Sequence, residues 1–243
     1  ARRAAARDPR APSIPPARSP EPMITVHHLE RSRSHRVLWL LEELGLPYEL
    51  VRYQRDPETM LAPASLRAVH PLGKSPVITD GDTTVAESGA ILEYLVERHG
   101  GGKLVPPDGP DRLRYRYFLH YAEGSLMPPL LVKLICRRIA GAKMPFFARP
   151  IAKRIAGTID SAFAAPNVDR ALAFLESELE GRAWFAGDEL TAADIQMSYP
   201  LEAAVARGGG AVRTPNLTRV LAAMRARPAY ARALARGGPV MLD

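Results

Sequence analysis

The chain has 243 residues, of which 47% are hydrophobic and 24% charged, a composition typical of globular proteins with one large core or two small ones. No apolar run reaches the roughly 18 residues that a membrane-spanning helix requires, so we expect no membrane partner. Cys136 is the single cysteine, which excludes a disulfide framework within the chain and favours a reducing, cytoplasmic location.

The formal net charge of +7 does not predict nucleic-acid binding. Residues 1–22 contribute +3 of it, with five arginines against Asp8 and Glu21, and the other +4 is spread over the remaining 221 residues. No run of Lys and Arg alternates with aromatic residues that could stack on bases. We interpret the basic residues as a solvated surface and expect no nucleic acid as a partner.

Residues 1–22 stand apart in composition, with six prolines and few apolar residues. Such a segment cannot bury a core, so we expect a disordered extension. It lacks the apolar stretch of a secretory signal. Met23 is then a candidate start of the natural protein, and an Arg-rich transit peptide is the alternative.

Residues 23–101 carry the pattern of a small α/β domain, with the element order β-α-β-α-β-β-α. Glycine after an apolar helical stripe predicts the end of the first helix, and Asp80-Gly81-Asp82 predicts a tight hairpin turn. The expected elements are a strand over Ile24–Leu29, a helix with Val37 to Leu44 ending at Gly45, a strand over Tyr48–Tyr53, a short helix over Leu66–Val69, strands over Pro76–Thr79 and Thr83–Ala86, and a helix capped by Ser88.

The Gly- and Pro-rich tract 102–110 is the expected linker to a helical domain over residues 111–243. The stretch Gly141–Pro166 shows no readable pattern. Thr191 and Asp194 resemble a capping box, which makes Asp194 a structural residue. The expected helices are Arg112–Glu123 and Leu130–Ala140, broken at Pro128-Pro129; a helix with the stripe Val168, Leu172, Leu175 and Leu179, capped by Asn167; Ile195–Val205; and Leu217–Met224, opened by Thr214-Pro215.

Four motifs along the chain resemble the signatures of glutathione transferases. They are Ser32-Arg33-Ser34-His35-Arg36; His70-Pro71-Leu72-Gly73-Lys74-Ser75-Pro76; Glu87-Ser88-Gly89-Ala90-Ile91-Leu92; and Trp184-Phe185-Ala186-Gly187 followed by Leu190-Thr191-Ala192-Ala193-Asp194-Ile195. The match spans residues 24–236, and its first half is most similar to serine-type fungal and bacterial members. It implies an α/β thioredoxin-like N-terminal domain, an all-α C-terminal domain, glutathione as co-substrate, no metal or other cofactor, and a homodimer.

Glutathione has two carboxylates and one ammonium group, and a site for it needs partners for each. Glu87 can accept from the ammonium, while Ser88 at a helix N-terminus offers a hydroxyl and free N–H groups to a carboxylate. Lys74 can pair with the glycyl carboxylate. The resemblance implies that Pro76 follows a cis peptide bond and that the backbone of Ser75 pairs with the cysteinyl part. Without the resemblance, Ser88 is a plain cap, Glu87 a helix-dipole carboxylate and Lys74 a solvated side chain.

The expected catalytic group comprises Ser32, Ser34 and Arg36. A free thiol has a pKa near 8.5, and lowering it by one to two units requires roughly 1.4–2.7 kcal/mol. One hydrogen bond to a charged acceptor contributes about 1.5–3 kcal/mol, so a single hydroxyl is enough. Ser32, four residues before Arg36, has the spacing of the family's catalytic serine. Ser34 is the alternative, because it can also cap the first helix.

Other residues point to little further chemistry. His27 and His28 lie on the first strand and are interpreted as structural, and Cys136 as a buried apolar residue. No histidine has a zinc-ligand spacing. We expect conjugation of glutathione to a small apolar electrophile held by the helices around Tyr117–Leu131, with peroxidase activity as a further possibility. The alternative function is a non-catalytic binding or regulatory module of the same fold.

Overall fold

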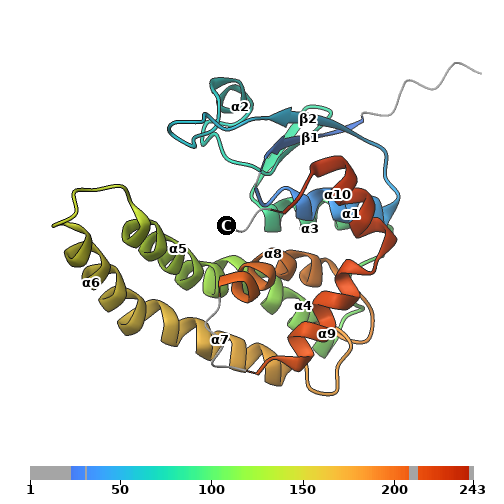
Figure 1. Ribbon diagram of the computed structural model, residues 1–243. Coiled ribbons are helices and arrows are strands. Elements are labelled where there is room, and N and C mark those ends of the chain that lie inside the picture. Colours follow the sequence, from blue (N-terminus) through green and yellow to red (C-terminus); the bar gives the residue numbers. More distant parts are fainter. Residues whose placement is uncertain (1–22, 31, 208–212, 241–243) are drawn as a thin grey trace, which may run out of the picture.

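The computed structural model describes residues 23–30, 32–207 and 213–240 (Figure 1). The expected disordered segment, residues 1–22, lies outside these described residues. The chain folds into a small α/β unit followed by a larger helical unit, as the resemblance implies.

The α/β unit is built on a four-stranded mixed sheet in the order β2-β1-β3-β4. β1 pairs in parallel with β2 and antiparallel with β3, and β3 and β4 form a hairpin. Asp80 pairs with Thr83 across that turn, where Gly81 adopts a φ of 56°, a left-handed conformation that glycine adopts without strain. The strands are β1 (Ile24–Leu29), β2 (Tyr48–Tyr53), β3 (Val77–Asp80) and β4 (Thr83–Ala86).

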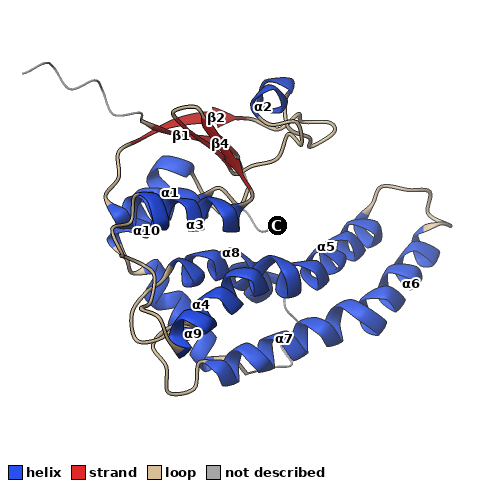
Figure 2. Ribbon diagram, turned by 180° about the vertical axis from the view of Figure 1, so that it is seen from behind, coloured by secondary structure: helices blue, strands red, loops and turns tan. Residues whose placement is uncertain are grey.

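Three helices complete the unit: α1 (His35–Leu44), α2 (Ala64–Val69) and α3 (Ser88–Arg98). Gly45 ends α1 at a φ of 69°, as its place after the apolar stripe predicts. Figure 2 shows α1 and α3 between the sheet and the helical unit, with α2 away from them. The predicted order β-α-β-α-β-β-α is therefore confirmed.

The helical unit contains two long helical runs that lie side by side (Figure 1). Two π turns, η1 and η2, interrupt them without ending them. The first run consists of α4 (Pro110–Tyr121), η1 (Ala122–Leu126) and α5 (Met127–Gly141), and the second of α6 (Arg149–Ile159), η2 (Asp160–Ala164) and α7 (Ala165–Glu178). Then follow α8 (Ala192–Arg207), α9 (Pro215–Arg225) and α10 (Pro228–Gly237). None of the helices in the described ranges is long and apolar enough to span a bilayer.

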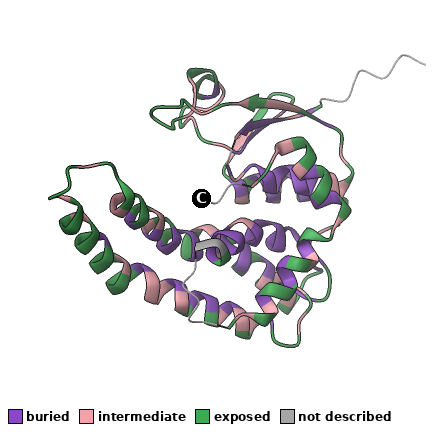
Figure 3. Cartoon of the chain, viewed as in Figure 1, coloured by how far each residue is buried: buried purple, intermediate pink, exposed green. Residues whose placement is uncertain are grey.

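Two expectations for this unit were wrong. Pro128 and Pro129 do not break the run, because they lie in the first turn of α5, where a missing N–H costs little. Asn167 is not an N-cap: it lies inside α7, and its Nδ2 donates to the carbonyl of Phe163 at 2.7 Å. The stretch without a readable pattern contains α6, which is largely exposed (Figure 3). Its Ile151 and Ile155 are exposed, so these apolar residues do not mark a core face.

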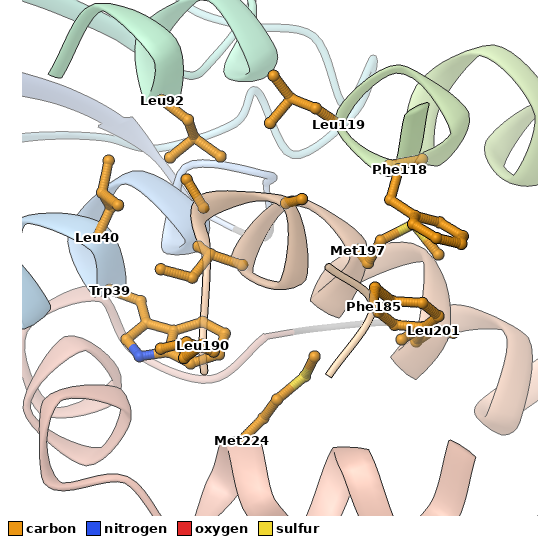
Figure 4. Close-up of a cluster of buried hydrophobic side chains, with 14 of the residues drawn as sticks. Trp39, Leu40, Leu92, Phe118, Leu119, Phe185, Leu190, Met197, Leu201 and Met224 are labelled. Carbon is orange, nitrogen blue, oxygen red and sulfur yellow. The ribbon is translucent and has the colours of Figure 1, made fainter. Parts of the chain in front are cut away.

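One apolar core joins the two units. Figure 4 shows Trp39, Leu40 and Leu92 of the α/β unit facing Leu119, Leu190 and other side chains of the helical unit. α1 and α3 pack on α8, and α10 packs on α1. The sheet and the helices are therefore held in one fixed arrangement beside the segments that carry the sequence motifs.

Asp194 makes its half of the predicted capping box, whereas its own N–H donates to the Thr191 carbonyl at 3.1 Å and not to the Thr191 hydroxyl. Its Oδ2 accepts from the backbone N–H and the hydroxyl of Thr191, at 2.8 and 2.7 Å, and its Oδ1 accepts from the Phe185 N–H at 2.8 Å. The side chain is fully buried, and this burial raises the pKa of Asp194 to about 6 against the opposing effect of the hydrogen bonds.

Candidate active site

Two serines lie together in the loop between β1 and α1. The hydroxyls of Ser32 and Ser34 are 2.7 Å apart, and both side chains are buried. The Ser34 backbone N–H also donates to Ser32 Oγ at 3.3 Å. Ser34 holds the N-cap position of α1, but its side chain makes no capping bond. Its hydroxyl instead lies 2.7 Å from Nδ1 of His28 on β1.

The segment before β3 approaches the same loop. The Ser75–Pro76 peptide bond is cis, as the resemblance implies. The Ser75 hydroxyl donates to the His27 carbonyl at 3.0 Å and accepts from the Leu29 N–H at 3.1 Å. These bonds fasten Ser75 to the end of β1, and they place its Oγ 3.3 Å from Ser32 Oγ.

Glu87 and Ser88 form the third part of the site, where β4 turns into α3. Glu87 is exposed and adopts a φ of 72°, a strained conformation for a residue with a side chain. Ser88 is the first residue of α3 and is buried. Its hydroxyl accepts from Nε2 of Gln196 on α8 at 3.2 Å. Ser88 therefore lies at a helix N-terminus and is held from the helical unit.

These segments surround one cavity of about 190 Å³. Lys74, Ser75 and Pro76 line one side, and Glu87 and Ser88 line another. The remaining lining residues are Arg33, His70, Leu72, Ala86 and Glu123. The lining combines cationic groups, the carboxylates of Glu87 and Glu123, and the N-terminus of α3. This is the set of partners that a small zwitterion with several carboxylates requires. Within the described ranges, no three His, Cys, Asp or Glu residues gather as metal ligands would.

Arg36 lies behind the cavity and is not part of its lining. Its side chain is fully buried, its Nη1 donates to the Gln196 carbonyl at 2.8 Å, and its Nη2 lies 2.5 Å from Glu123 Oε1. Burial lowers the pKa of Arg36, and the carboxylate of Glu123 opposes that effect. Arg36 therefore links the α/β unit to the helical unit through Gln196 and Glu123, and no hydrogen bond to the serine hydroxyls is among its contacts in the described residues.

Comparisons with known proteins match both halves of the chain. Residues 32–98 match the family model described as glutathione S-transferase, N-terminal domain, and residues 146–228 match its C-terminal domain. Glutathione S-transferase 1 of Saccharomyces cerevisiae is 34% identical over 76% of this chain and 82% of its own length. The chain belongs to the glutathione S-transferase family.

Further members of the family agree. Glutathione S-transferase 3 of Schizosaccharomyces pombe is 35% identical over 75% of this chain and 74% of its own length. Among solved structures, a glutathione S-transferase of Actinobacillus pleuropneumoniae superposes with a TM-score of 0.72 at 33% identity, covering 90% of this chain and 95% of that one.

Three residues beside the site of this glutathione S-transferase family member escaped the sequence analysis. Glu123 lines the cavity and binds Arg36, Gln196 holds Ser88, and His28 binds Ser34. Glu123 and Gln196 lie in helices whose local patterns say nothing of the N-terminal half. His28 was interpreted as structural because a strand position alone does not reveal its partner.

Proposed function

We propose that the chain is an active glutathione transferase that conjugates the glutathione thiolate to small apolar electrophiles. The observation that supports this most is that Lys74, Ser75, Pro76, Glu87 and Ser88, from separate segments, line one cavity beside the Ser32 hydroxyl. Two structural neighbours, from a sphingomonad and from Xanthomonas axonopodis, were solved with glutathione bound, and their fold is the fold of this chain.

Each charged part of glutathione has a partner in this cavity. The γ-glutamyl carboxylate takes the hydroxyl of Ser88 and the free N–H groups at the start of α3, and its ammonium takes the exposed carboxylate of Glu87. The glycyl carboxylate pairs with Lys74. This arrangement directs the cysteinyl part toward the cis peptide bond of Pro76.

The sulfur then lies beside Ser32, whose hydroxyl stabilises the thiolate by donating a hydrogen bond. The thiolate attacks an electrophilic carbon, a C–S bond forms, and a leaving group departs with its electron pair. The exposed Leu72, which lines the same cavity, offers apolar surface to the electrophile. The family's glutathione is a co-substrate, so no further cofactor is part of this proposal.

A separate groove of about 440 Å³ lies between the two long helical runs. Aromatic residues line it, among them Tyr117, Tyr121, Phe163 and Phe174. The electrophile was expected to bind in this region, around Tyr117–Leu131. The groove, however, shares no lining residue with the glutathione cavity. We therefore assign the groove to the contact with a second copy of the chain in a homodimer, since Tyr117 and Phe163 are 48% and 49% exposed.

The test measures glutathione affinity by calorimetry and the pKa of the bound thiol by ultraviolet titration, in the wild type and in Ser32→Ala. We expect Ser32→Ala to raise the thiol pKa by about one to two units and to lower turnover with an aryl halide. Ser161→Ala is the matched control, because Ser161 is an exposed serine in η2. An unchanged titration in Ser32→Ala, with a change in Ser34→Ala, would transfer the role to Ser34. A wild type that binds glutathione without lowering its thiol pKa would instead identify a non-catalytic module, and a hydroperoxide substrate tests the peroxidase activity.

A further inference from the structure

A continuous chain of short hydrogen bonds leads from the thiol position into the sheet. Ser32 Oγ is 2.7 Å from Ser34 Oγ, which is 2.7 Å from His28 Nδ1. Ser34 is fully buried, and His28 and Ser32 are 5% and 9% exposed. His28 also lines a further cavity of about 320 Å³, together with Glu30 and Arg52. These hydrogen bonds therefore run from Ser32, which is bonded to the cavity-lining Ser75, to a residue that lines a separate cavity.

The direction of the protons along these hydrogen bonds depends on the tautomer of His28. A neutral imidazole with its proton on Nε2 has an accepting Nδ1. In that tautomer Ser34 donates to His28 Nδ1, and Ser34 Oγ is left to accept from Ser32. The inference below starts from this arrangement.

Ser75 does not donate a hydrogen bond to Ser32. Its own hydrogen is directed to the His27 carbonyl at 3.0 Å, so it can only accept from Ser32, at 3.3 Å. The Ser34 oxygen is closer to Ser32, at 2.7 Å. In this arrangement Ser32 points its hydrogen toward Ser34. One lone pair of Ser32 Oγ accepts from the Ser34 backbone N–H at 3.3 Å, and the other is left to accept a hydrogen bond from an incoming S–H group.

We propose that His28 is the acceptor of the glutathione thiol proton, which reaches it through Ser32 and Ser34. The S–H bond breaks as its proton passes to Ser32 Oγ, the Ser32 proton passes to Ser34 Oγ, and the Ser34 proton passes to His28 Nδ1. The products are a thiolate and an imidazolium. Both hydroxyls now point the other way, so that Ser34 donates to Ser32 and Ser32 donates to the sulfur. After the C–S bond forms, the imidazolium releases the proton to solvent through the further cavity that His28 lines.

The surroundings of His28 favour an imidazole that is unprotonated at neutral pH and can therefore accept a proton. Burial lowers the pKa of His28, as does the nearby Arg52, while Glu30 and the Gly237 carbonyl act in the opposite direction. His35 on α1 also faces it, and burial lowers the pKa of His35 to about 4, so that ring is neutral as well. His28 is therefore unprotonated when glutathione arrives, and the imidazolium is stabilised once the thiolate lies at the other end of the chain.

This inference rests on the proposed function, and three variants separate the two. His28→Asn keeps a side-chain acceptor for Ser34 but cannot take up a proton, Ser34→Ala interrupts the chain, and His27→Asn is the control on the neighbouring strand position. The measurements are the ultraviolet absorbance of the bound thiolate and kcat/KM with an aryl halide, both from pH 5.5 to 9.5, alongside calorimetry of glutathione binding.

We expect His28→Asn and Ser34→Ala to lose about 10- to 100-fold of the thiolate at pH 7 and to regain it above pH 9, with unchanged glutathione affinity. The double variant should lose no more thiolate than either single variant, because both substitutions interrupt the same series of hydrogen bonds. A wild-type amount of thiolate in His28→Asn would overturn the proposal. It would mean that His28 only positions Ser34 as a hydrogen-bond acceptor, a role that Asn can also fill. If His28→Asn does not fold, the amount of bound thiolate in Ser34→Ala is the deciding measurement: a loss supports the proposal and a wild-type amount overturns it. If the amount of thiolate depends on Ser32 but on neither His28 nor Ser34, only the proton transfer to His28 is refuted. If it does not depend on Ser32, the proposed function is refuted.

Discussion

Glu123 of the π turn η1 reaches the fully buried guanidinium of Arg36, with Oε1 2.5 Å from Nη2. The same oxygen lies 3.1 Å from Nε of Arg33, and the side chain lines the glutathione cavity. One carboxylate thus ties the loop that carries Ser32 and Ser34 to the helical unit. The position of the loop with Ser32 and Ser34 depends on a residue about ninety positions further along the sequence.

Removing this carboxylate should destabilise the fold strongly. Glu123→Ala leaves Arg36 buried without its counter-charge, which costs about 3 kcal/mol, at the lower end for buried pairs because Glu123 is partly exposed. Glu123→Gln keeps an acceptor and should lose less. Urea unfolding of both variants measures the effect, with Glu180→Ala, an exposed glutamate, as the control. Equal unfolding midpoints for Glu123→Ala and the control would show that the pair adds nothing to stability.

The strained backbone of Glu87 predicts that two substitutions differ in stability although both weaken glutathione binding. At a φ of 72° glycine is relaxed whereas alanine is not, so Glu87→Gly should be more stable than Glu87→Ala by about 1 kcal/mol. Both should bind glutathione roughly ten- to hundredfold more weakly, because the ammonium loses its carboxylate. Thermal melting and calorimetry give the two quantities. Asp82→Ala removes an exposed acid from the nearby hairpin turn, and it should change neither.

Ser88 should contribute to binding through its hydroxyl. In Ser88→Ala the γ-glutamyl carboxylate loses one donor and Gln196 Nε2 loses its acceptor. We expect about tenfold weaker glutathione binding in calorimetry and a small loss of stability. Gln196→Ala separates the two effects, since it keeps the Ser88 hydroxyl. Wild-type affinity in Ser88→Ala would assign this serine to the helix start alone.

Asp194 should give the protein a distinctive dependence of stability on pH. Its pKa is about 6 in the folded chain, against 3.8 in the unfolded chain. Between pH 4 and 6 the folded state therefore binds more protons, and the stability due to this group falls as the pH rises through that window, by about 3 kcal/mol. Asp194→Asn does not titrate. The difference in unfolding free energy between wild type and variant should shrink from pH 4.5 to 7, and a constant difference would contradict the assignment.

The groove between the helical runs should hold a second copy of the chain. Tyr117→Lys places a charge on its apolar lining and should convert a dimer to a monomer in sedimentation velocity. Ala235→Lys adds the same charge at an exposed site on α10, outside the groove. A dimer that survives Tyr117→Lys would move the interface elsewhere.

Local signals in the sequence predicted the strands and the hairpin well. β1 and β2 have the expected bounds, because apolar runs and flanking turn residues mark them directly. α6 was missed although Ile151, Ile155 and Ile159 recur every four residues; all three are exposed, so this stripe faces away from the core. The Glu–Ser motif and the cis proline came from the resemblance, whereas the partners Glu123, Gln196 and His28 depend on tertiary packing that no local pattern encodes.

The contact of α10 with the first strand and helix has a consequence for the order in which the protein matures. A side chain at Gly237 would lie 2.7 Å from Leu38 and 3.5 Å from the His28 ring, so α10 seats closely against both. A ribosome releases His28 about two hundred residues before Gly237. A nascent chain that stops short of α10 has the serines but lacks the packing of Gly237 against the His28 ring. On the proposed mechanism, the surroundings of the proton acceptor are therefore completed only when synthesis reaches α10.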